Sequence, residues 1–312
     1  MLKKLPLSSY ILFSFILVCL AFLLLANIEI QSSMIIETAF NFGHLPLFGV
    51  VALVILWILN HRSWPVSDQR YYLVAFTITF VLGIVTEVAQ IFFPERYFEV
   101  KDIIYNTLGA ITFLTLSYPF PREYRKKGMR LKIISAGIVV LAAVPIIPAV
   151  MDTGNMRQNF PVLSSFESYL EMQRWSAKDA EISRSRSHAS HGRYSVRTDL
   201  APEEFPGISL EYLMGDWQRY STLSFDVFNP QDSSLAMVVR IHDRHHNNAY
   251  TDRFNSRFDL VPGSNTVVID LKDVLRAPTR REMDMGNIVN ICIFSHNLTE
   301  RRTVYFDHFR LQ

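Results

Sequence analysis

A set of polar and small residues lies inside otherwise apolar sequence, and its spacing could gather it at one site in a membrane. Members on the same stretch are three or four residues apart, so they would share one face of a helix. Ionisable side chains at membrane depth are costly and are retained mostly where they face a bundle interior or a water-filled cavity. The set consists of His44, Glu87, Gln90, Arg96, Asp102, Asn106 and Gly109.

This set has more than one interpretation. Glu87, Asp102 or both could pair with Arg96 and fasten two helices together. A polar pocket in the outer leaflet could instead bind a lipid-linked or amphiphilic ligand without catalysis. As an alternative, a membrane enzyme could use Glu87 or Asp102 as general acid or base on a lipid-linked glycan or cell-wall precursor. A transporter is disfavoured because the polar groups lie at one depth and no inverted repeat is visible.

Five apolar runs position this set, at about residues 10–28, 40–59, 71–93, 103–118 and 133–150. Each approaches the roughly 20 residues needed to cross a hydrocarbon core. With the N-terminus inside, ten Lys or Arg residues flank the runs on the inner side and two on the outer side, a clear positive-inside bias. We expect a four-helix bundle over residues 1–130, a fifth membrane helix over 131–151, and an external C-terminus.

The second half of the chain has a different pattern. Residues 155–312 carry 39 of the Lys, Arg, Asp and Glu residues. After a linker at 152–164, short β-type runs alternate with turn residues, and Leu223, Phe225 and Val227 alternate with outward positions. The expected strands are 194–198, 207–212, 222–228, 235–242, 257–260, 266–271, 288–294 and 303–311. They predict an all-β jelly-roll sandwich over 165–312.

One segment of this outer domain is rich in groups that could hold sugar hydroxyls. It is the polar stretch RIHDRHHNNAYTDRF at 240–254, which supplies planar donors, acceptors and a ring. An exposed hairpin whose side chains only face water is the competing interpretation. The candidate glycan-binding residues are Arg240, His242, Asp243, Tyr250, Asp252 and Arg253.

The membrane part resembles the VanZ-like family. The pattern ExxQxxxxxR, then Asp, then NxxG, falls on the set described above, and the resemblance covers about residues 35–120. His44 fits an early histidine of the family, but Phe40 and Asn41 replace the Asp-Lys pair that often precedes it. The resemblance implies a bacterial cell-envelope protein in the inner membrane that contacts lipid-linked or cell-wall glycan, with membrane lipids around it.

The outer domain is similar to galactose-binding-like, carbohydrate-binding-module-type sandwiches. SHGRYSVR at 190–197, GDWQRYSTLSFDVFNP at 215–230 and VYFDHFRL at 304–311 carry the similarity. In such modules an early Glu and a late Asp often bind a structural calcium, and Glu167 and Asp307 are the candidates here. Hard oxygen ligands suit calcium. Trp175 and Trp217 are expected in the core.

The remaining features narrow the function classes. Two cysteines, Cys19 and Cys292, make neither a disulfide framework nor a zinc site. The excess positive charge belongs to the membrane half, so nucleic-acid binding is not expected. There is no Gly-rich phosphate loop, no HExxH and no GxSxG, so no known enzyme signature or organic cofactor is indicated. The sequence does not identify protein partners.

Overall fold

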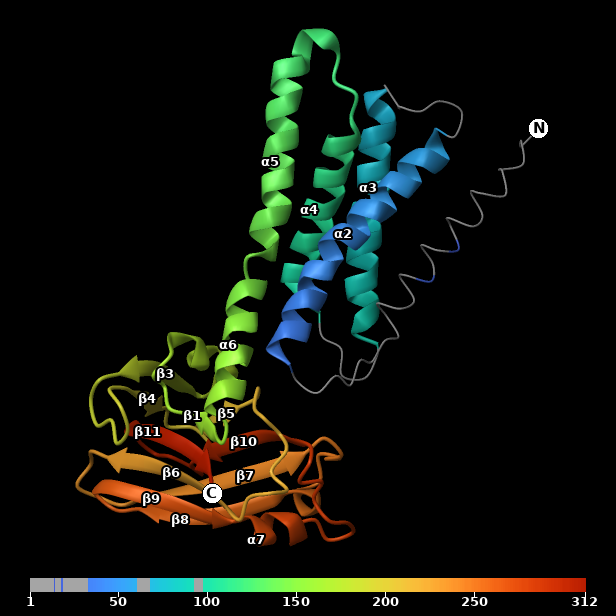
Figure 1. The fold of residues 1–312 in the computed structure, drawn as a ribbon. Helices are drawn as coiled ribbons and strands as arrows, with labels where there is room; N and C mark the ends of the chain where they lie inside the picture. Colours follow the sequence, from blue (N-terminus) through green and yellow to red (C-terminus); the bar gives the residue numbers. More distant parts are fainter. Residues whose placement is uncertain (1–13, 15–17, 19–32, 61–67, 93–97) are drawn as a thin grey trace. The chain divides into compact units, whose positions relative to one another are not determined.

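The computed structural model describes residues 14, 18, 33–60, 68–92 and 98–312. It divides into two units, and Figure 1 shows one as helical and the other as built mainly of strands. The helical unit includes Ile36–Ile147, and the strand-rich unit includes Pro148–Gln312. The first apolar run (residues 10–28), Cys19 and Arg96 belong to the undescribed part of the chain, apart from two helical residues at 14 and 18.

Four helices make up the described helical unit: α2 (Met34–Leu59), α3 (Gln69–Gln90), α4 (Val100–Ser117) and α5 (Arg125–Ala143). Helix α4 contacts both α3 and α5. Asp68 precedes α3 as its N-cap, and its side chain accepts a hydrogen bond from the Arg70 N–H, which satisfies one of the free donors of the first turn.

Small residues let these helices approach closely. Ala52 of α2, Ala75 of α3 and Ala110 of α4 are fully buried in one cluster. At Gly109 an added Cβ would lie 2.1 Å from the Leu45 carbonyl oxygen of α2. Only glycine fits this crossing of α2 and α4, as the small-residue position in the sequence predicts.

By length and composition, three of the described helical stretches can cross a membrane: α2, α3 and Arg122–Asn159. Helix α4 is shorter, with 18 residues, and Lys101 and Asp102 lie in its first turn. The structure therefore supports a multi-pass membrane region, while five crossings stay a prediction.

The second unit is a sandwich of two antiparallel sheets. One sheet has the order β3-β4-β11-β6-β9 with β1 paired to β11, and the other has the order β2-β5-β10-β7-β8. The strands are β1 (Val162–Ser164), β2 (Trp175–Lys178), β3 (Ala180–Ser185), β4 (Ser195–Leu200), β5 (Gly207–Leu210), β6 (Thr222–Asn229), β7 (Leu235–Asp243), β8 (Phe254–Leu260), β9 (Gly263–Asp270), β10 (Ile288–Phe294) and β11 (Arg302–Leu311).

The inner faces of the two sheets form one core. In β6, Leu223, Phe225 and Val227 are buried as the alternation predicts, and Trp175 and Trp217 are in the same core. All eight expected strands are present, and their ends match the expected ones or differ from them by at most three residues. The sequence pattern does not predict β1, β2 and β3, because these strands are short or polar.

Residues 152–159, expected within a polar linker, are instead the last turns of helix α6 (Ile146–Asn159). Asp152, in this part of the helix, is buried. Its Oδ2 lies 3.1 Å from Nε of Arg174, and both side chains are almost fully buried. Arg174 ends a short 3-10 helix (Tyr169–Arg174) and also donates to the Leu163 carbonyl at 2.7 Å. One polar residue of the expected linker, Asp152, is thus a buried ion-pair partner.

Candidate functional site: a buried polar cluster and an arginine-lined groove

The helical unit gathers most of the expected polar set. His44 of α2, Glu87 and Gln90 of α3, and Asp102 and Asn106 of α4 are all buried. His44 Nδ1 and Asn106 Oδ1 are 3.0 Å apart, and His44 Nε2 lies 3.6 Å from Asp102 Oδ2. Two residues one helical turn apart on α4 therefore contact the two nitrogens of one imidazole.

Glu87 joins this cluster from α3. Its Oε2 accepts a long hydrogen bond of 3.5 Å from the Glu99 N–H, where Glu99 is the N-cap of α4. One ligating atom from each of His44, Glu87 and Asp102 lies within 4.8 Å of the other two. These three side chains could hold a divalent cation. Their spacing along the sequence does not reveal that they meet.

Asn106 has capacity for one more contact. Its Nδ2 is buried without a hydrogen-bond partner in the described part of the chain. A buried amide donor normally has a partner, so this N–H group is available to a polar ligand. Arg96, the remaining member of the set, lies outside the described residues.

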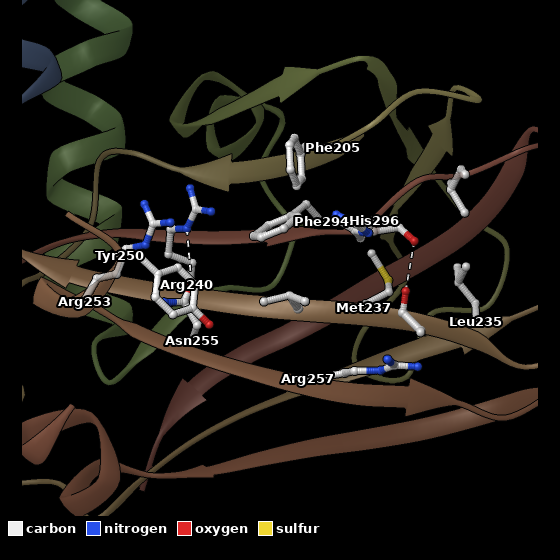
Figure 2. A pocket seen from close by; sticks show the side chains of 14 residues that line it. Phe205, Leu235, Met237, Arg240, Tyr250, Arg253, Asn255, Arg257, Phe294 and His296 are labelled. Atoms are coloured by element: carbon white, nitrogen blue, oxygen red, sulfur yellow. Dashed lines mark hydrogen bonds between the residues drawn. The ribbon is translucent and has the colours of Figure 1, made fainter. Parts of the chain in front are cut away.

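A groove of about 560 Å³ opens on the sandwich. It lies over β7, β8 and β10, and Phe205 borders it from the loop before β5 (Figure 2). Strand pairing places Arg240 of β7 beside Asn255 of β8 and Cys292 of β10. The lining consists of Phe205, Leu235, Ala236, Met237, Val238, Arg240, Tyr250, Arg253, Asn255, Arg257, Phe294, Ser295, His296 and Leu298.

Two arginines of the groove lie against aromatic rings. The Arg240 guanidinium is 4.8 Å from the centroid of Phe294, and that of Arg253 is 5.4 Å from the centroid of Tyr250. Arg240 Nε also lies 3.4 Å from Asn255 Oδ1. Such cation–π contacts hold the guanidinium groups in place while leaving most of their N–H donors available.

The groove separates the predicted glycan-binding residues into two groups. Arg240, Tyr250 and Arg253 line it. His242 instead packs against His246 with the two rings tilted and 4.7 Å between their centroids, and Asp243 and Asp252 both pair with Arg281. The sequence pattern does not identify the phenylalanines of the groove or Asn255, although the period-2 pattern of β7 does place Arg240 on the outward face.

Arg281 organises the loop that carries Tyr250. It donates from Nη2 to Asp243 Oδ1 at 2.8 Å and from Nε to Asp252 Oδ1 at 2.7 Å. Hydrogen bonds from Arg281 are the main cause that lowers the pKa of Asp252 to about 2. Burial raises the pKa of Asp243, but hydrogen bonds from Arg281 and the Asp284 N–H outweigh it, so this pKa also lies below its usual value.

Comparisons with known proteins separate the two halves in the same way. Residues 3–120 match the family model VanZ/LLP1. The N-terminal region is a VanZ/LLP1 domain. No curated protein has a sequence that matches this chain.

Beyond the VanZ/LLP1 domain, the chain is similar to solved structures that carry β-sandwich modules. One is a family 11 carbohydrate-binding module from Clostridium thermocellum in complex with a β-1,3-1,4-mixed-linked tetrasaccharide (16% identity, 48% of this chain and 93% of that chain, TM-score 0.39). Another is an exo-β-agarase (16% identity, 48% and 24%, TM-score 0.40). These values describe a likeness in fold.

The calcium candidates have other partners in this sandwich. Glu167 Oε1 accepts hydrogen bonds from the N–H groups of Arg193 and Tyr194. Asp307 Oδ2 accepts from the N–H groups of Ser190 and His191, and Oδ1 from that of His308. Calcium needs six to eight oxygen ligands, whereas these carboxylates face N–H donors. The donor set therefore does not fit calcium in this arrangement.

Proposed function

We propose that this protein is an integral membrane protein of the bacterial cell envelope whose sandwich binds glycan through the groove on β7, β8 and β10. The observation that carries the proposal is the combination of aromatic rings and planar polar groups around one open groove. The comparisons establish a fold likeness only, so the support comes from the groove itself.

The chemistry of the lining suits a saccharide. The ring of Tyr250 is mostly exposed and Phe205 borders the same groove (Figure 2), so sugar rings could pack on these two rings, whereas Phe294 is buried beneath Arg240. Asn255 and the guanidinium of Arg240 supply donors and acceptors for hydroxyl groups. Pockets of this kind use an apolar lining with a few polar groups that fix orientation.

Tyr250→Ala in the full-length protein tests this proposal. We expect loss of the ring to weaken glycan binding by about five- to tenfold, measured by titration in detergent against a glycan panel that includes mixed-linked β-glucan. Tyr169→Ala is the matched control, because Tyr169 is equally exposed (71% against 70%) and lies outside the groove. Equal affinity of the two variants would place the binding surface elsewhere.

For orientation, we propose an inside N-terminus, five crossings and an external sandwich. The support is the ten-to-two distribution of Lys and Arg around the apolar runs. Alkaline phosphatase fused after Gln312 should be active, and a reporter that is active only in the cytoplasm should be silent there. The reverse pattern would contradict this topology.

For the VanZ/LLP1 domain, we propose that the buried cluster binds the polar group of a lipid-linked or amphiphilic ligand without catalysis. The support is the meeting of five buried polar side chains from three helices and the donor of Asn106 that has no partner in the described region. A Glu87→Gln protein that is inserted and abundant but fails to reverse the envelope defect of a deletion strain would favour this role. A fully functional Glu87→Gln protein would argue against it.

A further inference from the structure

The charge of the groove is unusual for a site that would take a neutral sugar. Its lining includes Arg240, Arg253, Arg257 and His296, and none of its fourteen residues is Asp or Glu. Figure 2 shows the Arg240 and Arg253 side chains at the same end of the groove. A neutral saccharide would be bound through hydroxyl groups, for which carboxylate acceptors are as useful as donors.

Nearby carboxylates do not neutralise these two arginines. Asp243 and Asp252 are engaged by Arg281, and Asp259 is 3.6 Å from Arg257. Within the described residues, no carboxylate lies within 4.0 Å of the Arg240 or Arg253 guanidinium. The Nε of Arg253 is also buried without a hydrogen-bond partner there.

The two positive charges are close enough to affect each other. Burial is the first cause that lowers the pKa of Arg253, and the charge of Arg240 is the second. An anion between them would relieve this repulsion and accept hydrogen bonds from both planar groups. Arginine is the residue best suited to bind carboxylate or phosphate in this bidentate way.

We propose that the groove binds an anionic glycan, in which a sugar carboxylate or a phosphate sits between Arg240 and Arg253 while the chain packs along Phe205 and Tyr250. This inference rests on the proposed glycan-binding function and specifies its ligand class. A carboxylate of a uronic acid and a phosphate of a polyol-phosphate polymer present the same chemistry to the two guanidinium groups.

The test is a titration of the full-length protein in neutral detergent with matched ligands. Oligogalacturonate is compared with its methyl ester, which has the same chain without the charge, and poly(glycerol phosphate) is compared with glycerol oligomers. We expect one charged ligand to bind at least about tenfold more tightly than its neutral counterpart. Which charged ligand binds identifies the source of the anion.

Substitutions of Arg253 test whether this residue causes the higher affinity for the charged ligand. Arg253→Gln should weaken binding of the charged ligand by about tenfold or more, and Arg253→Lys should restore it only in part, because lysine keeps the charge but not the planar fork. Arg219→Gln removes an exposed positive charge outside the groove and should change nothing. Equal unfolding temperatures of the variants show that each is folded.

The outcomes separate the two proposals. If neutral and charged glycans bind equally well and Tyr250→Ala weakens both, glycan binding stands and the anionic class is wrong. If no glycan binds in either form, both proposals fall. Binding only to phosphatidylglycerol vesicles would likewise overturn both and assign the groove to a membrane surface.

Discussion

His44 and Asn106 connect helices α2 and α4 through Nδ1 and Oδ1, 3.0 Å apart and buried. Since Asn106 Oδ1 can only accept, His44 Nδ1 is the donor, and Nε2 faces Asp102 at 3.6 Å. The Asn106 amide thereby orients the imidazole so that Nε2 is directed at Asp102.

Replacing His44 and Asn106 tests whether their contact stabilises the helical unit. Asn106→Leu leaves Nδ1 of His44 buried without its acceptor and should lower the free energy of unfolding by about 1–3 kcal/mol. The double variant His44→Phe/Asn106→Leu should recover about 1 kcal/mol of that loss, the usual size of such couplings between membrane helices. Unfolding in SDS measures both. Additive single effects would mean that the two side chains are not coupled.

Gly109→Ala is expected to disrupt the crossing of α2 and α4. The added Cβ would meet the Leu45 carbonyl oxygen at 2.1 Å, and backbone cannot move aside as a flexible side chain can. Gly137→Ala is the control, because a Cβ there meets nothing within 4 Å, and alanine should stabilise that helix by about 0.5–1 kcal/mol. The fraction of monodisperse protein after detergent extraction compares them, and equal yields would contradict the close approach.

Arg281→Met should destabilise the sandwich by about 3 kcal/mol or more at neutral pH, because two buried carboxylates lose their partner. The pKa of Asp252 lies near 2, below its usual value of 3.8, so this carboxylate stabilises the fold above about pH 4, and that contribution is lost as pH falls towards 2. The difference between wild type and variant should therefore shrink below pH 4.

Hydrogen exchange of β7 peptides from pH 7 to pH 3 measures the difference in stability between wild type and Arg281→Met. The exchange rates are corrected for the effect of pH on the intrinsic rate. Arg280→Met is the control, since Arg280 is exposed and adjacent in sequence. A difference that grows in acid would show that Arg281 does not act through these carboxylates.

The ion pair between Asp152 and Arg174 predicts where an isolated sandwich must begin. A fragment of residues 148–312 retains the pair, whereas 160–312 lacks Asp152 and leaves Arg174 with Glu171 and the Leu163 carbonyl. We expect the shorter fragment to melt roughly 6–12 °C lower, from a loss of about 3 kcal/mol. Asp152→Asn in the longer fragment should reproduce most of that loss. Equal melting of both fragments would mean that Glu171, 3.4 Å from Arg174, is a sufficient partner.

Calcium provides a further check on the sandwich. Because Glu167 and Asp307 already accept backbone N–H bonds, we expect neither EDTA nor added calcium to change the unfolding temperature. A rise in that temperature with calcium, abolished by Asp307→Asn, would show that the loop at 190–194 rearranges to bind the ion.

Strands and shared helix faces can be predicted well from the sequence where the periodicity or spacing of residues determines them. Strand 288–294 is predicted with its observed ends, since its apolar pattern lies between clear breakers, and Asp102 and Asn106 share a helix face because they are four apart. Partners distant in the chain are not predictable in this way. Arg281 reaches Asp243 across 38 residues, and nothing local to either residue signals the other.

The same reason explains why the sequence does not separate the residues that line the groove from those engaged beside it. Asp243 and Asp252 look like sugar ligands in the sequence, but tertiary pairing with Arg281 engages them. Phe205 lies on an irregular loop, where no repeat pattern marks its direction. The polar residue Asp152 suggests an exposed linker, because burial of a charged side chain depends on a partner 22 positions away.

Helix α6 ends at Asn159 and β1 begins at Val162, so only two residues of chain separate them. A module on a flexible tether explores a volume that grows with tether length, and it must order that tether when its ligand is fixed. Here Asp152 of α6 contacts Arg174 of the sandwich, so the chain between α6 and β1 is not a flexible tether. A pull on a ligand held in the proposed glycan groove would therefore be transmitted as mechanical load into α6 rather than absorbed by loose chain.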